Sequence, residues 1–139
     1  MKTVTILGAT GSVGTSTLDL VMREPGAYRV LALTAQTDVA GLARAARATQ
    51  AELAVIGDAS LYDALKEALR DTNIAVAAGP EAVVETAAAG ADWTMAAIVG
   101  CAGLRATLAA LRSGRTVALA NKESLVSAGD VMMATAHDS

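Results

Sequence analysis

Short runs of apolar residues alternate along this chain with longer segments in which apolar residues recur every three or four positions. The short runs predict strands and the periodic segments predict amphipathic helices. Strands are expected at Thr3–Leu7, Arg29–Ala35, Leu53–Ile56, Ile74–Ala77, Asp92–Val99 and Arg115–Ala120. Helices are expected at Ser12–Arg23, Val39–Ala48, from Asp58 or Ser60 to about Arg70, and at Glu81–Ala89, Ala102–Arg112 and Glu123–Ala136.

The alternation of strands and helices predicts an α/β fold with a doubly wound, mostly parallel sheet. Several strands, such as Leu53–Ile56, are apolar throughout, as expected when helices cover both faces of the sheet. Right-handed crossovers bring the carboxyl ends of all strands to one edge, where this architecture binds its ligands. The segments expected at that edge are Gly8–Gly14, Gln36–Asp38, Gly57, Gly79, Val99–Gly103 and Asn121–Ser124.

The first strand runs directly into a glycine-rich turn with the spacing G-x-x-G-x-x-G, from Gly8 to Gly14. Glycine lets the backbone approach a phosphate, and the free N–H groups of a helix opening at Ser12 face the negative charge. The pattern is a variant of the dinucleotide-binding fingerprint and has the strand before it and the helix after it that the fingerprint requires. Apolar residues at helical spacing follow it: Val13, Leu18, Val21 and Met22. A tight strand–helix turn without a ligand would use the same glycines.

Composition limits the classes of protein that fit. The 139 residues make about one domain, and they are 53% hydrophobic with 33 alanines and no phenylalanine, so we expect a core packed from small side chains. The net charge of -3, with no cluster of Lys and Arg, argues against a nucleic-acid surface. The lone cysteine, Cys101, fits a reducing cytoplasm. We expect no membrane span, because no apolar run approaches the necessary length, and no signal peptide, because the first residues enter a strand at once.

Polar residues follow the last expected strand at Asn121, Lys122 and Glu123. Asn121 can hydrogen-bond a ribose or an amide, and Glu123 can accept hydrogen bonds from ribose hydroxyls. Both would equally suit the cap and the first turn of a helix. A helix N-terminus disfavours the positive charge of Lys122, which indicates that this residue serves a phosphate or a developing oxyanion instead.

Three segments, in this order and spacing, resemble the 1-deoxy-D-xylulose 5-phosphate reductoisomerase family: Gly8–Gly14, Met95–Gly100 and Leu119–Val126. The resemblance runs from residue 1 to about residue 130 and implies a Rossmann-like NADPH-binding domain. Enzymes of this family isomerise 1-deoxy-D-xylulose 5-phosphate and reduce the product with NADPH. They form 2-C-methyl-D-erythritol 4-phosphate in non-mevalonate isoprenoid synthesis.

The resemblance also implies roles for individual residues. The NADPH pyrophosphate and ribose would contact Thr10, Gly11, Ser12 and Val13. The nicotinamide half would contact Asn121 and Glu123, and Lys122 would reach the sugar-phosphate substrate. A homodimer and a Mg²⁺ or Mn²⁺ ion are implied as well.

The loop after the second strand, Gln36–Asp38, departs from the family pattern. It is expected to face the adenosine ribose, where a 2′-phosphate prefers Arg or Lys and where an acidic residue suits the 2′-hydroxyl of NAD. We expect Asp38 to cap the next helix and point away, and NADPH to bind more tightly than NADH.

The family's metal-binding carboxylates, substrate-phosphate site and lid lie beyond the position where this chain stops, Ser139. We therefore expect residues 1–139 to form a dinucleotide-binding domain, whose end at 123–139 leads toward an absent catalytic domain. No catalytic residue or metal ligand is expected in it, and it should bind cofactor without turnover. Two alternatives remain: a dehydrogenase of the aspartate-semialdehyde type, although Cys101 lacks matching surroundings, and a non-enzymatic dinucleotide-sensing module.

Overall fold

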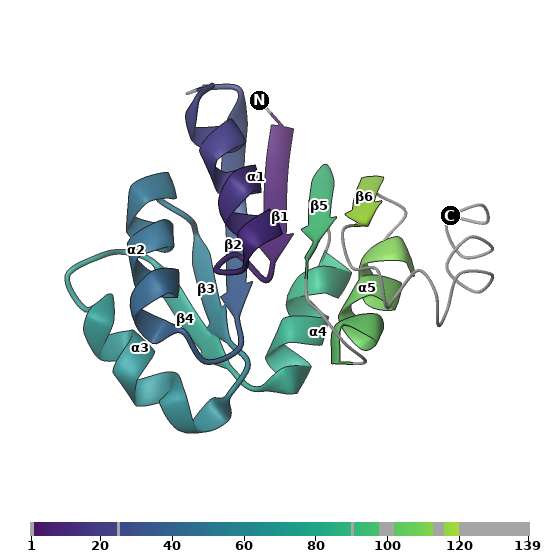
Figure 1. The fold of residues 1–139 in the computed structure, drawn as a ribbon. Coiled ribbons are helices and arrows are strands. Elements are labelled where there is room, and N and C mark those ends of the chain that lie inside the picture. The colour runs from purple at the N-terminus through teal and green to yellow at the C-terminus, as the bar shows by residue number, and fades with distance from the viewer. Residues whose placement is uncertain (1, 25, 90, 98–101, 113–115, 120–139) are drawn as a thin grey trace.

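The computed structural model describes residues 2–24, 26–89, 91–97, 102–112 and 116–119 (Figure 1). The strands are β1 (Lys2–Leu7), β2 (Tyr28–Ala35), β3 (Leu53–Ile56), β4 (Ala75–Ala78), β5 (Trp93–Ala96) and β6 (Thr116–Leu119). The helices are α1 (Ser12–Met22), α2 (Val39–Thr49), α3 (Tyr62–Ala68), α4 (Pro80–Ala89) and α5 (Ala102–Arg112), with a short 3₁₀ helix η1 (Ala59–Leu61) before α3.

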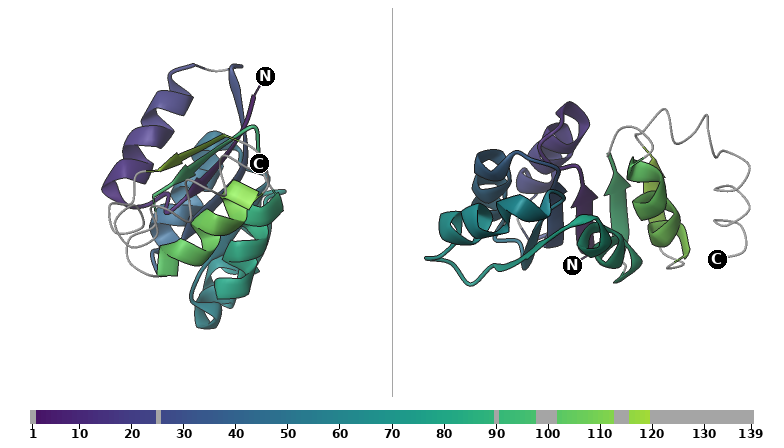
Figure 2. Two further views of the ribbon diagram at one scale, coloured as in Figure 1. Left: turned by 90° about the vertical axis from the view of Figure 1, so that its right-hand side faces the viewer. Right: turned by 90° about the horizontal axis from the view of Figure 1, so that it is seen from below.

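All neighbouring strands pair in parallel, in the order β4-β3-β2-β1-β5-β6. The chain moves outward from β1 to β4, returns through α4 to the other side of β1, and continues outward to β6. Since the direction of winding reverses at β1, helices α1 to α3 cover one face of the sheet, and α4 and α5 cover the other (Figure 2). The predicted doubly wound α/β fold is confirmed.

Each face of the sheet has its own layer of buried side chains. Under α1 to α3 the layer contains large aliphatic residues such as Ile6, Leu33 and Leu42. Under α4 and α5 it is rich in alanine, and the residues of this layer are Leu7, Val55, Val83, Ala87, Ala96, Ala106 and Ala110. Small side chains let helices approach closely, so the expected packing from alanine is confirmed, chiefly on this second face.

The observed elements differ from the predicted ones in a few places. Of the apolar residues at helical spacing in α1, Leu18 and Val21 are buried, whereas Met22 is 46% exposed. Met22 is the last residue of α1, and the ends of helices fray. The helix expected from Asp58 or Ser60 is divided, because Asp58 caps η1 and α3 begins only at Tyr62. The last expected helix, Glu123–Ala136, lies outside the described residues.

Candidate functional site

The turn between β1 and α1 is held by the end of β2. The N–H of Gly8 donates to Thr34 Oγ1 at 2.9 Å, and the N–H of Ala9 donates to the Thr34 carbonyl oxygen at 2.7 Å. Gly8 has a φ of 82°, a conformation that other residues rarely adopt. Thr34 was not predicted as a site residue, although a polar residue within the apolar stretch 30–35 was a signal. Its two contacts fix the path by which the chain leaves the sheet.

Gly14 brings helix α1 against this turn. A Cβ at Gly14 would lie 2.1 Å from the carbonyl oxygen of Gly8 and 2.8 Å from Cα of Ala9, so no other residue fits there. This close approach is the purpose of the third glycine in dinucleotide-binding turns. Gly11, the N-cap residue of α1, has no side chain to cap the helix, and the first turn contains no acidic residue. The N–H groups at the start of α1 are thus suited to an anion.

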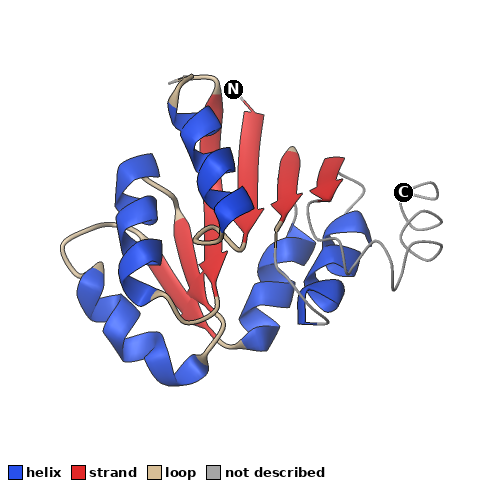
Figure 3. Cartoon of the chain, viewed as in Figure 1, coloured by secondary structure: helices blue, strands red, loops and turns tan. Residues whose placement is uncertain are grey.

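A crevice of about 380 Å³ lies beside the turn, at the point where the strand order reverses. We call it the switch-point crevice. The residues that line it are Gly8, Thr10, Gly11, Thr34, Ala35, Gln36, Pro80, Val83, Val84, Ala97, Arg105 and Ala106. Figure 3 shows the arrowheads of the strands pointing toward one edge of the sheet, from which loops lead into the helices. The crevice thus lies at the edge of the sheet where ligand binding was predicted, and binding there stays a prediction.

The crevice brings together some of the predicted site residues. Thr10 and Gly11 line it, and Ser12 and Val13 begin α1 directly after them. The other three predicted contacts, Asn121, Lys122 and Glu123, lie outside the described residues.

The crevice has an apolar wall of Pro80, Val83 and Val84 from α4, and these residues were not predicted as part of the site. Their apolar character was visible, but only the strand order brings α4 beside the glycine turn.

Asp38 caps helix α2, as expected. Its Oδ1 accepts a hydrogen bond from the N–H of Gly41 at 2.9 Å. A Cβ at Gly41 would lie 2.4 Å from Oδ2 of Asp38, so glycine leaves room for the carboxylate at the cap. The loop residue that lines the crevice is Gln36, whose side chain lies over Gly57.

Arg105 reaches the crevice from the first turns of α5. Its guanidinium pairs with the carboxylate of Glu81, at the start of α4, with an Nη2–Oε1 distance of 2.8 Å. Both side chains are largely exposed, so the pair lies at the mouth of the crevice rather than in the core.

No three His, Cys, Asp or Glu side chains lie close enough in the described part of the chain to hold a metal ion together. We therefore assign no metal ligand among these residues. The described helices likewise include none that is long and apolar enough to cross a membrane.

Known proteins resemble this chain closely. The family model for 1-deoxy-D-xylulose 5-phosphate reductoisomerase matches residues 4–129. The reductoisomerase of Zymomonas mobilis is 64% identical over 132 residues, which are 95% of this chain and 34% of that protein. The reductoisomerase of Rhodospirillum centenum is 55% identical over 134 residues, which are 96% of this chain and 33% of that protein.

The solved structures agree with the sequence comparison. The Z. mobilis enzyme in complex with NADPH matches with a TM-score of 0.96 and 61% identity, over 99% of this chain and 36% of that one. A DOX-P reductoisomerase with NADPH, fosmidomycin and magnesium matches with a TM-score of 0.92 and 38% identity, over 99% and 34% of the two chains. The chain thus spans about a third of the length of its relatives. From the turn, the fold and these matches, we conclude that the chain belongs to the 1-deoxy-D-xylulose 5-phosphate reductoisomerase family.

Proposed function

We propose that residues 1–139 form the NADPH-binding domain of a 1-deoxy-D-xylulose 5-phosphate reductoisomerase. The observation that carries this proposal is the Gly8–Gly14 turn, which opens onto the switch-point crevice with the first N–H groups of α1. A relative that was solved in complex with NADPH has nearly the same fold over 99% of this chain.

The residues of the crevice fit a dinucleotide. Thr10 and Gly11, followed by the N–H groups of Ser12 and Val13, would hold the pyrophosphate against the positive end of α1. The apolar wall of Pro80, Val83 and Val84 would exclude water from the adenosine half. NADPH, when bound, supplies the hydride for a reduction, and these side chains only hold and orient it.

Further roles follow from membership of the family. We assign Asn121 and Glu123 to the nicotinamide half of NADPH and Lys122 to a sugar-phosphate substrate. The conversion of 1-deoxy-D-xylulose 5-phosphate, the homodimer and the cytoplasmic location are proposals for the complete protein. A relative was solved with magnesium, but we assign no magnesium ligand in the described part of this chain.

A titration tests the proposal directly. Purified polypeptide of residues 1–139 is titrated with NADPH and with NADH, and the fluorescence of the reduced nicotinamide is followed. We expect saturable binding with higher affinity for NADPH. Equal or reversed affinities would contradict the cofactor assignment, and binding of neither would refute the proposed function.

A second assay tests activity. We expect no NADPH oxidation when this polypeptide is supplied with 1-deoxy-D-xylulose 5-phosphate and Mn²⁺, because it spans only about a third of the known enzymes. Measurable turnover would show that this third contains a working active site.

A further inference from the structure

Arg105 is the one charged side chain among the described residues that line the switch-point crevice. It is the fourth residue of α5, close to the positive end of the helix dipole, where a cation is disfavoured. Local helix structure therefore gives no reason for an arginine at this position.

The ion pair with Glu81 does not supply that reason either. The side chains are 60% and 71% exposed, and exposed ion pairs contribute little to stability. Glu81 is already favoured by its own place in the first turn of α4. The guanidinium can therefore leave this carboxylate at little cost for an anion that accepts stronger, charge-assisted hydrogen bonds. A phosphate monoester is such an anion, because its oxygens match the fork of N–H groups on arginine.

The loop between β2 and α2 lacks the cation that a 2′-phosphate requires. Its residues are Gln36, Thr37 and Asp38, and the carboxylate of Asp38 is bound to the N–H of Gly41. Gln36 lines the same crevice as Arg105. The carboxylate of Asp38, which would favour NAD, is thus held at the cap of α2. The cation that lines the crevice is Arg105 of α5 instead.

We propose that Arg105 binds the adenosine 2′-phosphate of NADPH, in place of a basic residue in the β2–α2 loop. In the absence of cofactor, Glu81 holds the guanidinium at the mouth of the crevice. This inference rests on the proposed function, and it names a specificity-determining residue on α5 that no motif in the sequence indicates.

The test compares Arg105→Leu with the unchanged polypeptide of residues 1–139. We expect the affinity for NADPH to fall about tenfold, as for the loss of one charge-assisted contact, while the affinity for NADH stays the same. Arg105→Lys keeps the charge without the paired N–H groups and should lose less. The matched control is Arg112→Leu, at the other end of α5 and outside the crevice, which should bind both cofactors normally.

Phosphorus NMR of bound NADP⁺ gives a second measurement that is independent of activity. The 2′-phosphate resonance should move in Arg105→Leu, while the pyrophosphate resonances keep their positions. Equal losses of affinity for NADPH and NADH would mean that Arg105 contacts a part common to both cofactors, and would overturn the proposal. No loss of affinity for either cofactor would overturn it as well. If the unchanged polypeptide binds neither cofactor, the proposed function itself fails. Thermal unfolding of each variant confirms that it is folded.

Discussion

Two glycines of the same turn face different constraints. At Gly14 a Cβ would lie 2.1 Å from a backbone oxygen, and backbone atoms cannot rotate away as a side chain can. At Gly11 the nearest atom to a Cβ is 3.7 Å away, and φ is −77°, which any residue adopts. The spacing of the motif treats Gly11 and Gly14 alike. Only the packed structure shows that Gly14 has no room for a side chain whereas Gly11 has.

We predict that Gly14→Ala lowers the free energy of unfolding by about 1–3 kcal/mol, the usual cost of forcing extra atoms into a packed site. The affinity for NADPH should fall as well, because the turn must move to admit the methyl group. Gly11→Ala adds the same group where there is space, so it should lower the free energy of unfolding by only about 0.5 kcal/mol, because the N-cap position prefers glycine to alanine. Urea denaturation measures both variants, and equal stabilities would contradict the packing argument.

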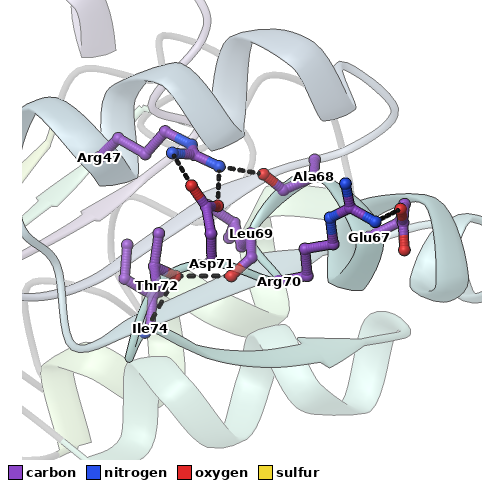
Figure 4. Close-up of polar contacts among 8 residues, drawn as sticks. All are labelled: Arg47, Glu67, Ala68, Leu69, Arg70, Asp71, Thr72 and Ile74. Atoms are coloured by element: carbon purple, nitrogen blue, oxygen red, sulfur yellow. Dashed lines mark hydrogen bonds and ion pairs between the residues drawn. The ribbon is translucent and has the colours of Figure 1, made fainter.

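Arg47, near the end of α2, contacts residues at and just after the end of α3 (Figure 4). Its guanidinium donates to the carboxylate of Asp71, with an Nη1–Oδ2 distance of 3.2 Å, and to the carbonyl oxygen of Ala68 at 2.7 Å. The second contact satisfies one of the carbonyl groups that the last turn of α3 leaves without a helical partner. The hydrogen bond from Arg47 lowers the pKa of the Asp71 carboxyl below its ordinary value.

This lowered pKa predicts a dependence of stability on pH. A carboxyl with a lower pKa in the folded state stabilises the fold above its ordinary pKa, and the contribution is lost as pH falls through the lowered value. The side chains of Arg47 and Asp71 are both exposed, so we expect Asp71→Asn to reduce stability only slightly near pH 7, and to have no effect well below pH 4, about the ordinary pKa of a carboxyl. Urea midpoints at both pH values measure this effect. Glu67→Gln, in the exposed pair with Arg70, is the control and should have little effect at either pH.

In the whole molecule, the switch-point crevice lies between the two halves of the sheet. One side comes from the β1–α1 turn and the end of β2, and the other from α4 and α5. A ligand in the crevice would contact elements that otherwise have separate buried layers on opposite faces of the sheet. Binding should therefore stabilise both halves together.

We predict that NADPH at about 100 times its dissociation constant raises the free energy of unfolding by about 2.7 kcal/mol, from linkage between binding and folding. Calorimetry in the presence and absence of NADPH measures the rise. Hydrogen exchange should slow at the start of α1 and at the first turns of α4 and α5. Slower hydrogen exchange in α1 alone would show that the cofactor does not contact α4 and α5.

The sequence was sufficient to predict the order of the described elements, the doubly wound fold and the cap at Asp38, and the resemblance of three segments indicated the family. Each of these depends on local spacing or on the fixed handedness of crossovers. Of the alternatives, the family match decides against the aspartate-semialdehyde dehydrogenase type.

Which residues meet at the crevice became visible only in the folded structure. Thr34 holds Gly8, Gly14 fits against Gly8, and Arg105 reaches the crevice from a helix far along the chain. Contacts of this kind depend on the strand order and on the depth at which helices pack. No periodicity along the chain encodes either, because both arise only when elements distant in sequence are packed together.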